Sequence, residues 1–460
     1  MNPFVQIVTV IYINIEGERC GECKAQHYRQ ELLCKSCGTT SQEQTILFLV
    51  GFLILFGIVL YIMMKMGRYF AAFAIAINYF QILFIFRSII MNWSDGVIQM
   101  FEYLSIFSFN LELAKPECMN PSINYFFKGE LMFLIPPMLF VGMLIVCILS
   151  VPPFSYPYLF LKKLIKRSNE DLPPITLEKL VNRFFNATKA FHVLLQFMYV
   201  SLCTWALGFY NCNAVESKYA MAKEPSIFCY EGIHAANEPY FVAALVLYVI
   251  GLPIYFSTLY IILYQTRYKH PMLLSMKKGV ERLLLSGASI YKPSTQFVVS
   301  AQLLMKLSIL LVQNFISDSV PTQAVVIQLA LFTYIGFLIY FKPYSEKDHT
   351  IADIFCQICS TLTIACGILF YTNKPTNSST VEQKKITDRV NSLTAIVITI
   401  TTCCVVAACI FVARDIHRGG KVLKVKIAED KEKRKSIQDE KERMKTLKRQ
   451  TMSMQKTSAF

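Results

Sequence analysis

The sequence predicts an all-α polytopic membrane protein: about nine transmembrane helices, a short extracellular Cys-rich module before them and a basic tail after them that is helical or disordered. Three observations predict this class. Hydrophobic residues make up 54% of the 460 residues and charged residues only 17%. Apolar runs of 18 residues or more recur along the chain, and no soluble core needs that many. Basic residues gather in a few linkers and in the last part of the chain.

The apolar runs divide the chain into three parts. We expect a Cys-rich module in residues 1–44, a transmembrane domain in residues 45–413 and a cytoplasmic tail in residues 414–460. Each predicted span is close to the ~20 residues that a helix needs to cross a hydrocarbon core of ~30 Å. The spans are predicted at residues 45–66, 69–90, 128–152, 187–209, 238–264, 296–315, 322–341, 351–371 and 391–413.

The module at the N-terminus contains two CxxC pairs, Cys20 with Cys23 and Cys34 with Cys37. Two interpretations compete. Paired CxxC sequences can hold a tetrahedral zinc ion, whereas in an oxidising compartment the same four cysteines would close two disulfides. The first fifteen residues lack a basic segment and a cleavage site of small residues, so they do not indicate a signal peptide.

The basic linkers predict which loops are cytoplasmic. The linkers after the first, third, fifth and ninth spans are rich in Lys and Arg, and all four fall on one side of the membrane. The positive-inside rule makes that side cytoplasmic, so we expect the N-terminus outside, the C-terminus inside and a location in the plasma membrane. On the outside, the module favours disulfides over zinc. The basic loop of residues 372–390 fits the rule less well.

Further features of the outer loops follow from this topology. Cys212 and Cys229 would form a disulfide between the fourth and fifth spans. Cys118 brings the outside cysteines to seven, an odd number, so one thiol is free or pairs with another chain. Asn377, in Asn-Ser-Ser, is a predicted glycosylation acceptor, whereas Asn186, in Asn-Ala-Thr, would be cytoplasmic.

Polar side chains recur inside the predicted spans, where they are costly and often functional. Those that we single out are Asn78, Gln81, Arg87, His192, Gln196, Gln302, Lys306, Asp353 and Gln357. Several are three or four residues apart, so they share a helix face that should turn away from lipid. Lys306 is expected to pair with an acidic group, Asp353 first and Glu130 second. Such faces fit a hydrated pathway, and they also fit hydrogen-bonded helix packing that conducts nothing.

The segment of residues 97–109 is unusual because its apolar run of about 13 residues is interrupted by Glu102. This run is short for a span and suits an interfacial or re-entrant helix on the outer side. Counting it as a span would place the basic linkers outside, against the positive-inside rule.

Enzyme motifs do not occur in the sequence. The six histidines are scattered, and HExxH, GxSxG, GxGxxG and Walker-type patterns are lacking. We therefore predict a protein that is not an enzyme and that uses no cofactor or metal ion. The functions left are conduction or transport, and a receptor or structural role in the membrane.

The tail from Arg414 to Phe460 holds fifteen Lys and Arg against seven Asp and Glu, a net charge of +8 out of the chain's +15. This charge predicts a segment that binds anionic lipids of the inner leaflet; the alternative is a disordered, solvated tail. Ser436 and Thr451 each lie two residues after an arginine and are predicted phosphorylation sites. The expected partners are the lipid bilayer, these anionic lipids and other copies of the chain in a homo-oligomer, with no nucleic acid.

Several stretches of the sequence resemble one family. INYFQILFIF, IFSFNLEL, LGFYNC with FCYEGIH, VIGLPIYF, YKPSTQF with MKLSILL, and YFKPY occur in this order within residues 15–415. They resemble the membrane domain of the large cysteine-rich transmembrane proteins of ciliates and other protists, in which EGF- or furin-like repeats precede the spans. This chain has one Cys-rich unit, GERCGECKAQHYRQELLCKSC, where those proteins have an array.

The resemblance implies a fold distantly similar to TRP and polycystin channels, and with it a cation channel with an EGF-like module. A TRP-like pore needs a re-entrant helix and a filter between its last pore-forming spans. The candidate loops at residues 316–321 and 372–390 do not match one, because the first is too short and the second is polar.

Overall fold

The computed structural model describes most of the predicted membrane domain and the tail. The described residues are 15–16, 22–23, 27–30, 33–37, 50–51, 57, 71–89, 91–108, 118, 123–149, 177–215, 218–265, 290–295, 297–316, 319–373 and 380–457. Most of the first predicted span, residues 45–66, lies outside them.

Helices make up nearly all of the described structure. They are α3 (Ala71–Arg87), α4 (Asp95–Leu104), η3 (Ser105–Ser108), α6 (Tyr125–Leu149), α8 (Leu177–Phe209), α9 (Gly232–Ala244), the π-helical η5 (Leu245–Ile250), α10 (Gly251–Gln265), η6 (Pro293–Thr295), α12 (Val298–Phe315), α13 (Val320–Phe341), α14 (Lys347–Thr372) and α15 (Thr380–Thr457). Among the described residues, seven helical segments are long and apolar enough to cross a membrane, and α3 is a shorter apolar helix. The chain is therefore a mostly helical integral membrane protein.

The ends of α13 show how local sequence sets the helix boundaries. Ser319 is its N-cap, and the hydroxyl of Ser319 accepts the backbone N–H of Thr322 at 3.4 Å. At the other end Lys342 adopts a left-handed conformation with φ of 43°, and Pro343 follows. A left-handed residue before a proline is a common way to stop a helix, and here it turns the chain into α14.

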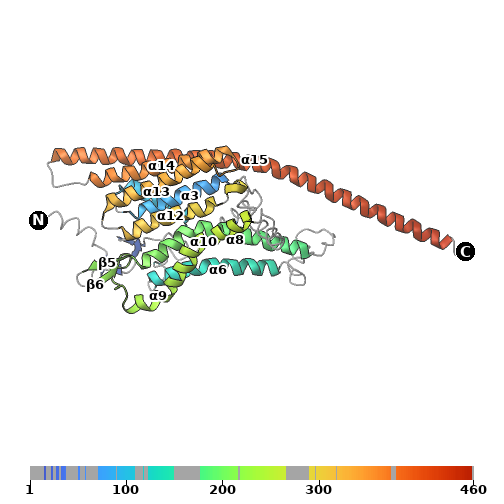
Figure 1. Ribbon diagram of the computed structural model, residues 1–460, viewed down its shortest axis with the longest axis horizontal. Coiled ribbons are helices and arrows are strands. Elements are labelled where there is room, and N and C mark those ends of the chain that lie inside the picture. Colours follow the sequence, from blue (N-terminus) through green and yellow to red (C-terminus); the bar gives the residue numbers. More distant parts are fainter. Residues whose placement is uncertain are drawn as a thin grey trace.

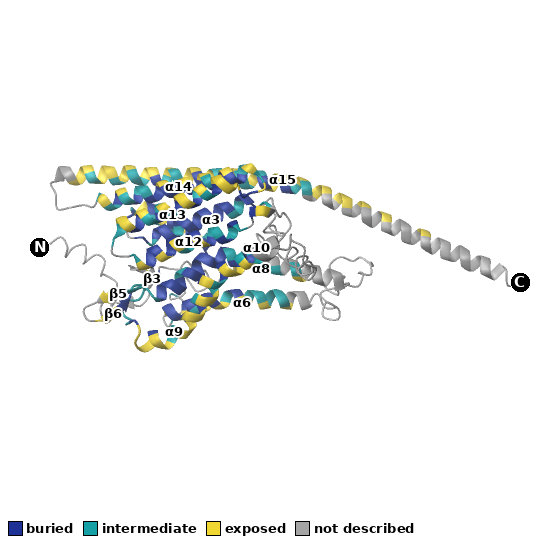
Figure 2. Cartoon of the chain, in the orientation of Figure 1, coloured by how far each residue is buried: buried dark blue, intermediate teal, exposed yellow. Residues whose placement is uncertain are grey.

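The helices form two groups (Figure 1). One group contains α3, α12, α13, α14 and α15, and the other contains α6, α8, α9, η5 and α10. The groups meet where α12 packs against α8 and α10, and where η3 packs against α8. Buried residues concentrate on α3, α12 and α8 in the middle of the bundle, whereas α15 and α9 expose much of their surface (Figure 2).

One end of the bundle, which we call the disulfide end, carries the short strands. The hairpins β1–β2 (Ile15–Glu16, Glu22–Cys23), β3–β4 (His27–Gln30, Leu33–Ser36) and β5–β6 (Cys212–Val215, Lys218–Met221) are all antiparallel. Cys212 is bonded to Cys229, the pairing that the sequence predicted, with the two Cα atoms 6.4 Å apart.

The other described disulfide corrects the prediction for the N-terminal module. Cys37 is bonded to Cys118, 81 residues away, and not to a cysteine of the module. The module is therefore tied to the loop between α4 and α6, which a reading of the local CxxC spacing could not foresee. The side chains of Cys20, Cys23 and Cys34 lie outside the described residues, as does Asn377.

The opposite end, which we call the tail end, is where α15 leaves the bundle. This helix has 78 residues and runs from the last predicted span into the tail without a break, so the tail is helical (Figure 1). Asp415 fixes it there, because its carboxylate accepts the backbone N–H of Ala72 at 3.2 Å and lies 3.0 Å from Nε2 of His349. Ser436 is exposed on this helix, and the side chain of Thr451 lies outside the described residues.

Candidate functional site

Three helices that run from the tail end to the disulfide end, α3, α8 and α12, meet at the junction between the two helix groups. Each is apolar along most of its length, yet α3 and α12 turn Gln81 and Lys306 inward, where both are at most 5% exposed. Lys306 lies eight residues into α12, at a depth of ~12 Å from its start. A charge at this depth is expensive unless other groups solvate it.

Gln81 supplies this solvation. The ammonium of Lys306 donates to Oε1 of Gln81 at 2.7 Å. Nε2 of the same amide donates to the backbone carbonyl of Phe197 on α8 at 2.6 Å and faces that of Phe107 in η3 at 3.4 Å. These four groups, Lys306, Gln81 and the two carbonyls, form what we call the lysine site. Because the carbonyls take the amide N–H groups, Oε1 is left to face the ammonium.

The segment α4–η3 re-enters the bundle to reach this site. Trp93 donates to the carbonyl of Phe86 at 3.1 Å, near the end of α3, and Glu102 pairs with Arg87 at 3.4 Å. Five residues further on, Phe107 stacks near Phe80, with ring centroids 4.8 Å apart. Since Phe80 lies about two turns back along α3, the chain has descended ~10 Å into the bundle.

The depth of η3 favours the re-entrant alternative for the segment of residues 97–109 over the interfacial one. Ser201 on α8 donates its hydroxyl to the carbonyl of Ser108. The carbonyls of Phe107 and Ser108 thus point at side chains of the spans and not at lipid. Carbonyls at the end of a helix at membrane depth are tolerated only where protein or a water-filled space surrounds them.

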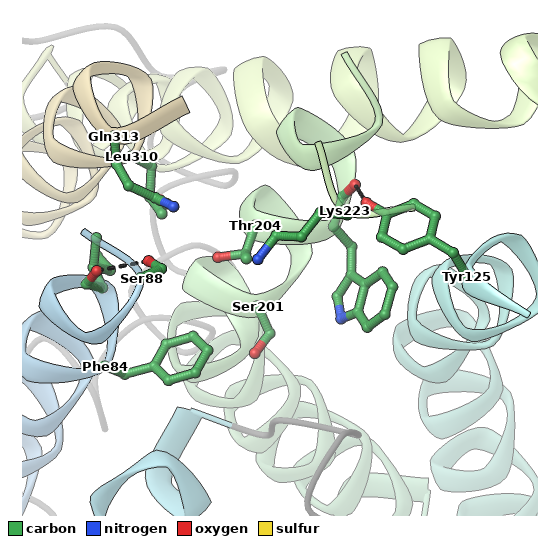
Figure 3. Close-up of a pocket in the computed structure, with 10 residues that line it drawn as sticks. Phe84, Ser88, Tyr125, Ser201, Thr204, Lys223, Leu310 and Gln313 are labelled. Atoms are coloured by element: carbon green, nitrogen blue, oxygen red, sulfur yellow. Dashed lines mark hydrogen bonds between the residues drawn. The ribbon is translucent and has the colours of Figure 1, made fainter. Parts of the chain in front are cut away.

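A small cavity lies next to the lysine site, on the side of the disulfide end, and Figure 3 shows the residues that line it. Its volume is about 30 Å³, and it is lined by Phe84, Ile85, Ser88, Tyr125, Ser201, Thr204, Trp205, Lys223, Leu310 and Gln313. Apart from Tyr125 and Lys223, the lining residues follow Gln81, Phe197 or Lys306 by three to eight positions, so they lie one or two turns further along α3, α8 and α12. We call this space the Lys223 cavity, after the lysine that reaches into it from the loop after β6.

A second group of polar side chains surrounds Asp353 on α14. Its carboxylate accepts the hydroxyl of Tyr344 at 2.8 Å, that of Tyr334 at 3.3 Å and the amide of Gln357 at 3.2 Å. We call these four residues the carboxylate cluster. Three donors on a fully buried carboxylate supply the hydrogen bonds that it loses on leaving water.

The sequences YKPST and YFKPY extend this cluster at the tail end. Tyr291 and Tyr344 form a β-bridge, and Lys292 N–H donates to the carbonyl of Pro343 at 2.8 Å. The hydroxyl of Tyr291 donates to Gln302 at 3.3 Å. Burial, and then the nearby Asp353 carboxylate, raise the pKa of both the Tyr291 and the Tyr344 phenol above the usual value. Both phenols therefore stay protonated and able to donate near neutral pH.

The expected pair of Lys306 with Asp353 is not formed. Among the described residues, Lys306 makes no ion pair within 4 Å, either with Asp353 or with Glu130, and its hydrogen bond goes to Gln81. The prediction was wrong because neutral groups satisfy each charge. Asp353 finds its donors on the α13–α14 hairpin, whereas Lys306 finds its acceptor 225 residues away on α3.

The remaining predicted residues lie apart from both sites. His192 bonds to the carbonyl of Thr188 at 2.6 Å and contacts the hydroxyl of Tyr255 on α10, so it joins two helices of one group. Arg87 lies near the disulfide end with Glu102. Gln196 is half-buried. Both polar atoms of the Asn78 side chain are buried without a hydrogen-bond partner in the described part of the chain.

Sequence reasoning missed the groups that complete the two sites. The tyrosines of the carboxylate cluster lie in the YKPST…YFKPY stretch, and their repeated Tyr and Pro residues were a signal that the two ends meet. Nothing in the sequence marks the carbonyls of Phe107 and Phe197, because every residue has a backbone carbonyl. Lys223 was not among the residues that the sequence singled out, although it lines the cavity.

One set of possible metal ligands occurs among the described residues, and it does not fit a metal. Cys212, Cys229 and His234 have ligand atoms within 4.8 Å of one another. Because the two cysteines are joined in a disulfide, neither can supply the thiolate that a metal needs. His234 instead accepts the backbone N–H of Tyr230 at 3.2 Å and contacts the carbonyl of Phe209 at 3.1 Å.

Comparisons of the chain with family models, curated proteins and solved structures gave no match. The resemblance to the cysteine-rich proteins of protists stays a hypothesis, and the function must be argued from the two sites themselves.

Proposed function

We propose that this protein moves a solute across the membrane, as a channel or a transporter, along a path that includes the Lys223 cavity and the lysine site. The observation that carries the proposal is the re-entrant segment, which brings the carbonyl of Phe107 to the amide of Gln81, the partner of the buried Lys306 at the junction of two helix groups. Transport sites typically contain intramembrane charges beside helices that are interrupted within the membrane. They also lie between groups of helices, as the lysine site does.

The lysine site has the capacity to bind a solute. An ammonium carries three N–H donors, and the described residues give this one a single hydrogen bond, to Gln81. The other donors are available to water or to a passing solute. The cavity one turn above the site supplies a place from which such a solute would approach.

The orientation that we propose places the disulfide end outside. The Cys37–Cys118 and Cys212–Cys229 bonds lie at that end, and disulfides persist in oxidising compartments. The basic α15 tail lies at the opposite end, in keeping with the positive-inside rule. A tag inserted after Ser41 should then be labelled on intact cells, and labelling only after permeabilisation would contradict the orientation.

A receptor or structural protein that conducts nothing is the competing candidate. The carboxylate cluster favours this candidate. Three donors from α13, α14 and their connection bond to Asp353, so its carboxylate does not need water as a donor. Hydrogen bonds of this kind stabilise helix packing in membranes without any transport.

Flux across liposomes that contain the purified protein distinguishes the two candidates. We expect the wild type to dissipate gradients of sodium, potassium or chloride salts faster than empty liposomes do, and Lys306→Met to lower the rate by about tenfold or more, a loss of about 1.4 kcal/mol in transition-state stabilisation. Ser308→Ala is the matched control, since Ser308 lies on the exposed face of the same helix. Wild-type rates equal to those of empty liposomes for every salt would reject transport.

A further inference from the structure

The Lys223 cavity has the size and the charge of a site for a small ion. We propose that it binds a monatomic monovalent anion, a halide, and that this anion is the solute class of the transport path proposed above, on which this inference rests. The cavity is lined by residues from α3, α6, α8 and α12 and by Lys223 from the loop after β6 (Figure 3).

Two nitrogen donors point into the cavity. In Figure 3 the amino group of Lys223 and the amide of Gln313 face the space between the helices. The orientation of Gln313 is fixed by neighbouring amides, because Asn314 donates to its Oε1 at 3.3 Å and Asn211 faces Asn314 at 3.4 Å. With Oε1 occupied, Nε2 is the atom that is left to serve a ligand.

The hydroxyl groups of the lining do not compete as donors. Ser88 donates to the carbonyl of Ile85 at 2.7 Å, and Thr204 donates to that of Val200 at 2.8 Å. Ser201 is bonded to Ser108 in η3. The donors that remain among the described lining residues are therefore the ammonium, the amide and the indole N–H of Trp205, which together would complement one negative charge.

The surrounding charges exclude a cation. The lining contains Lys223 and neither Asp nor Glu. Lys128 is buried behind the wall of the cavity, with its ammonium 5.8 Å from the centre of the Trp205 ring, and Lys306 lies one turn of α12 below Leu310. A second cation among these lysines would meet like charges in a setting of low dielectric, whereas an anion would be attracted.

The size of the cavity limits the ligand. About 30 Å³ is space for one or two water molecules, or for a monatomic ion that replaces them. An organic solute such as a sugar or an amino acid is larger than this space and would extend beyond it. The apolar side of the lining, with Phe84, Leu310 and Trp205, suits a large, weakly hydrated anion such as bromide or iodide better than a small, strongly hydrated one.

Trp205 provides a direct test, because the chain contains two tryptophans and the other, Trp93, lies in the contact between α4 and α14. We would titrate the purified Trp93→Phe protein with sodium iodide against sodium gluconate at constant ionic strength and follow Trp205 fluorescence. The expected result is a saturable change whose Kd rises about tenfold or more in Lys223→Met, which corresponds to about 1.4 kcal/mol. Lys218→Met is the matched control, because Lys218 lies on β6, is exposed and pairs with Glu231. Quenching that never saturates and is equal in Lys223→Met would overturn the proposal.

Thermal unfolding gives a second readout that needs no tryptophan variant. Bromide or iodide should raise the unfolding midpoint of the wild-type protein above its value in gluconate, and should not do so in Lys223→Met. The absence of any halide-specific shift in the wild type would also count against the site. Halide binding without flux would reject the proposed transport function and support the anion site. Flux without halide binding would support the transport function and reject the anion site.

Discussion

Lys306 and Asp353 are buried charges at similar depths of the same bundle, ~12 Å and ~9 Å from the starts of their helices, yet their surroundings differ. Asp353 is held by three donors that lie within 19 residues of it. Lys306 is held by Gln81, 225 residues away, and by the carbonyls that orient Gln81. The hydrogen bonds of Asp353 are made within one hairpin and stabilise that hairpin. The hydrogen bonds that hold Lys306 cross the junction, so they form only when the two groups of helices are correctly placed.

The difference extends to what lies around each charge. The carboxylate cluster is closed by tyrosines that pack at the tail end. The lysine site has a re-entrant segment on one side and the Lys223 cavity above it. We infer that the first stabilises the fold and the second carries the function, and the predictions that follow are ordered by the size of the expected effect.

Replacing Asp353 by Leu should have the largest effect on stability. The change leaves Tyr334, Tyr344 and Gln357 without their buried acceptor, and each unsatisfied donor costs about 1 to 3 kcal/mol. We expect a loss of about 3 to 5 kcal/mol in the free energy of unfolding, measured by chemical denaturation in detergent. Asp353→Asn keeps one acceptor oxygen and should lose less; an equal loss in the two variants would contradict the assignment.

An overpacking change at Gly367 on α14 should disturb the re-entrant segment and leave the carboxylate cluster in place. A Cβ atom at this position would overlap the sulfur of Met91 and the ring of Trp93, which lie just before α4. Gly367→Ala should therefore cost about 1 to 3 kcal/mol and reduce flux. Gly142→Ala on α6 is the control, because an added Cβ there meets nothing within 4 Å.

Replacing Lys306 by Met should change stability little, by about 1 kcal/mol or less. The change leaves Oε1 of Gln81 without its donor, but it also removes a buried charge that is costly to keep. A loss as large as that of Asp353→Leu would mean that the two charges have the same structural role. Denaturation under the same conditions as for Asp353→Leu makes the two values comparable.

Alkaline pH should lower the free energy of unfolding through Tyr291 and Tyr344. The pKa of Tyr291 and of Tyr344 is raised in the folded protein. Below pH ~10 both phenols are protonated in the folded and in the unfolded protein, so their contribution to the free energy of unfolding is complete there. Above pH ~10 the unfolded phenols lose protons while the folded ones keep them, so stability falls as pH rises. Unfolding midpoints from pH 8 to 11 should fall more steeply for the wild type than for Tyr344→Phe; parallel curves would reject this explanation.

The sequence was sufficient for the helices and insufficient for the contacts between them. Long apolar runs predicted the segments that became α6, α8, α12, α13 and α14, because length and hydrophobicity alone decide whether a helix can span. The short interrupted run around Glu102 was enough to suggest an interfacial or re-entrant helix, but it did not decide between the two.

Partners were harder to predict for a physical reason. A lysine within a span must be solvated, but an amide or a carbonyl can solvate it as well as a carboxylate, and the sequence does not say which is near. Gln81 was singled out for its position on a helix face, yet its bond with Lys306 depends on how α3 packs against α12. In the same way, the CxxC spacing predicted a local disulfide for Cys37, whereas its actual partner is Cys118.

The most direct test of this division of roles measures flux and stability on the same preparations of Lys306→Met and Asp353→Asn. We expect Lys306→Met to unfold at nearly the wild-type midpoint while its flux per protein falls about tenfold or more. Asp353→Asn should unfold earlier and keep most of its flux per folded protein. The reverse result, with flux lost in Asp353→Asn and retained in Lys306→Met, would contradict the assignment of function to the lysine site.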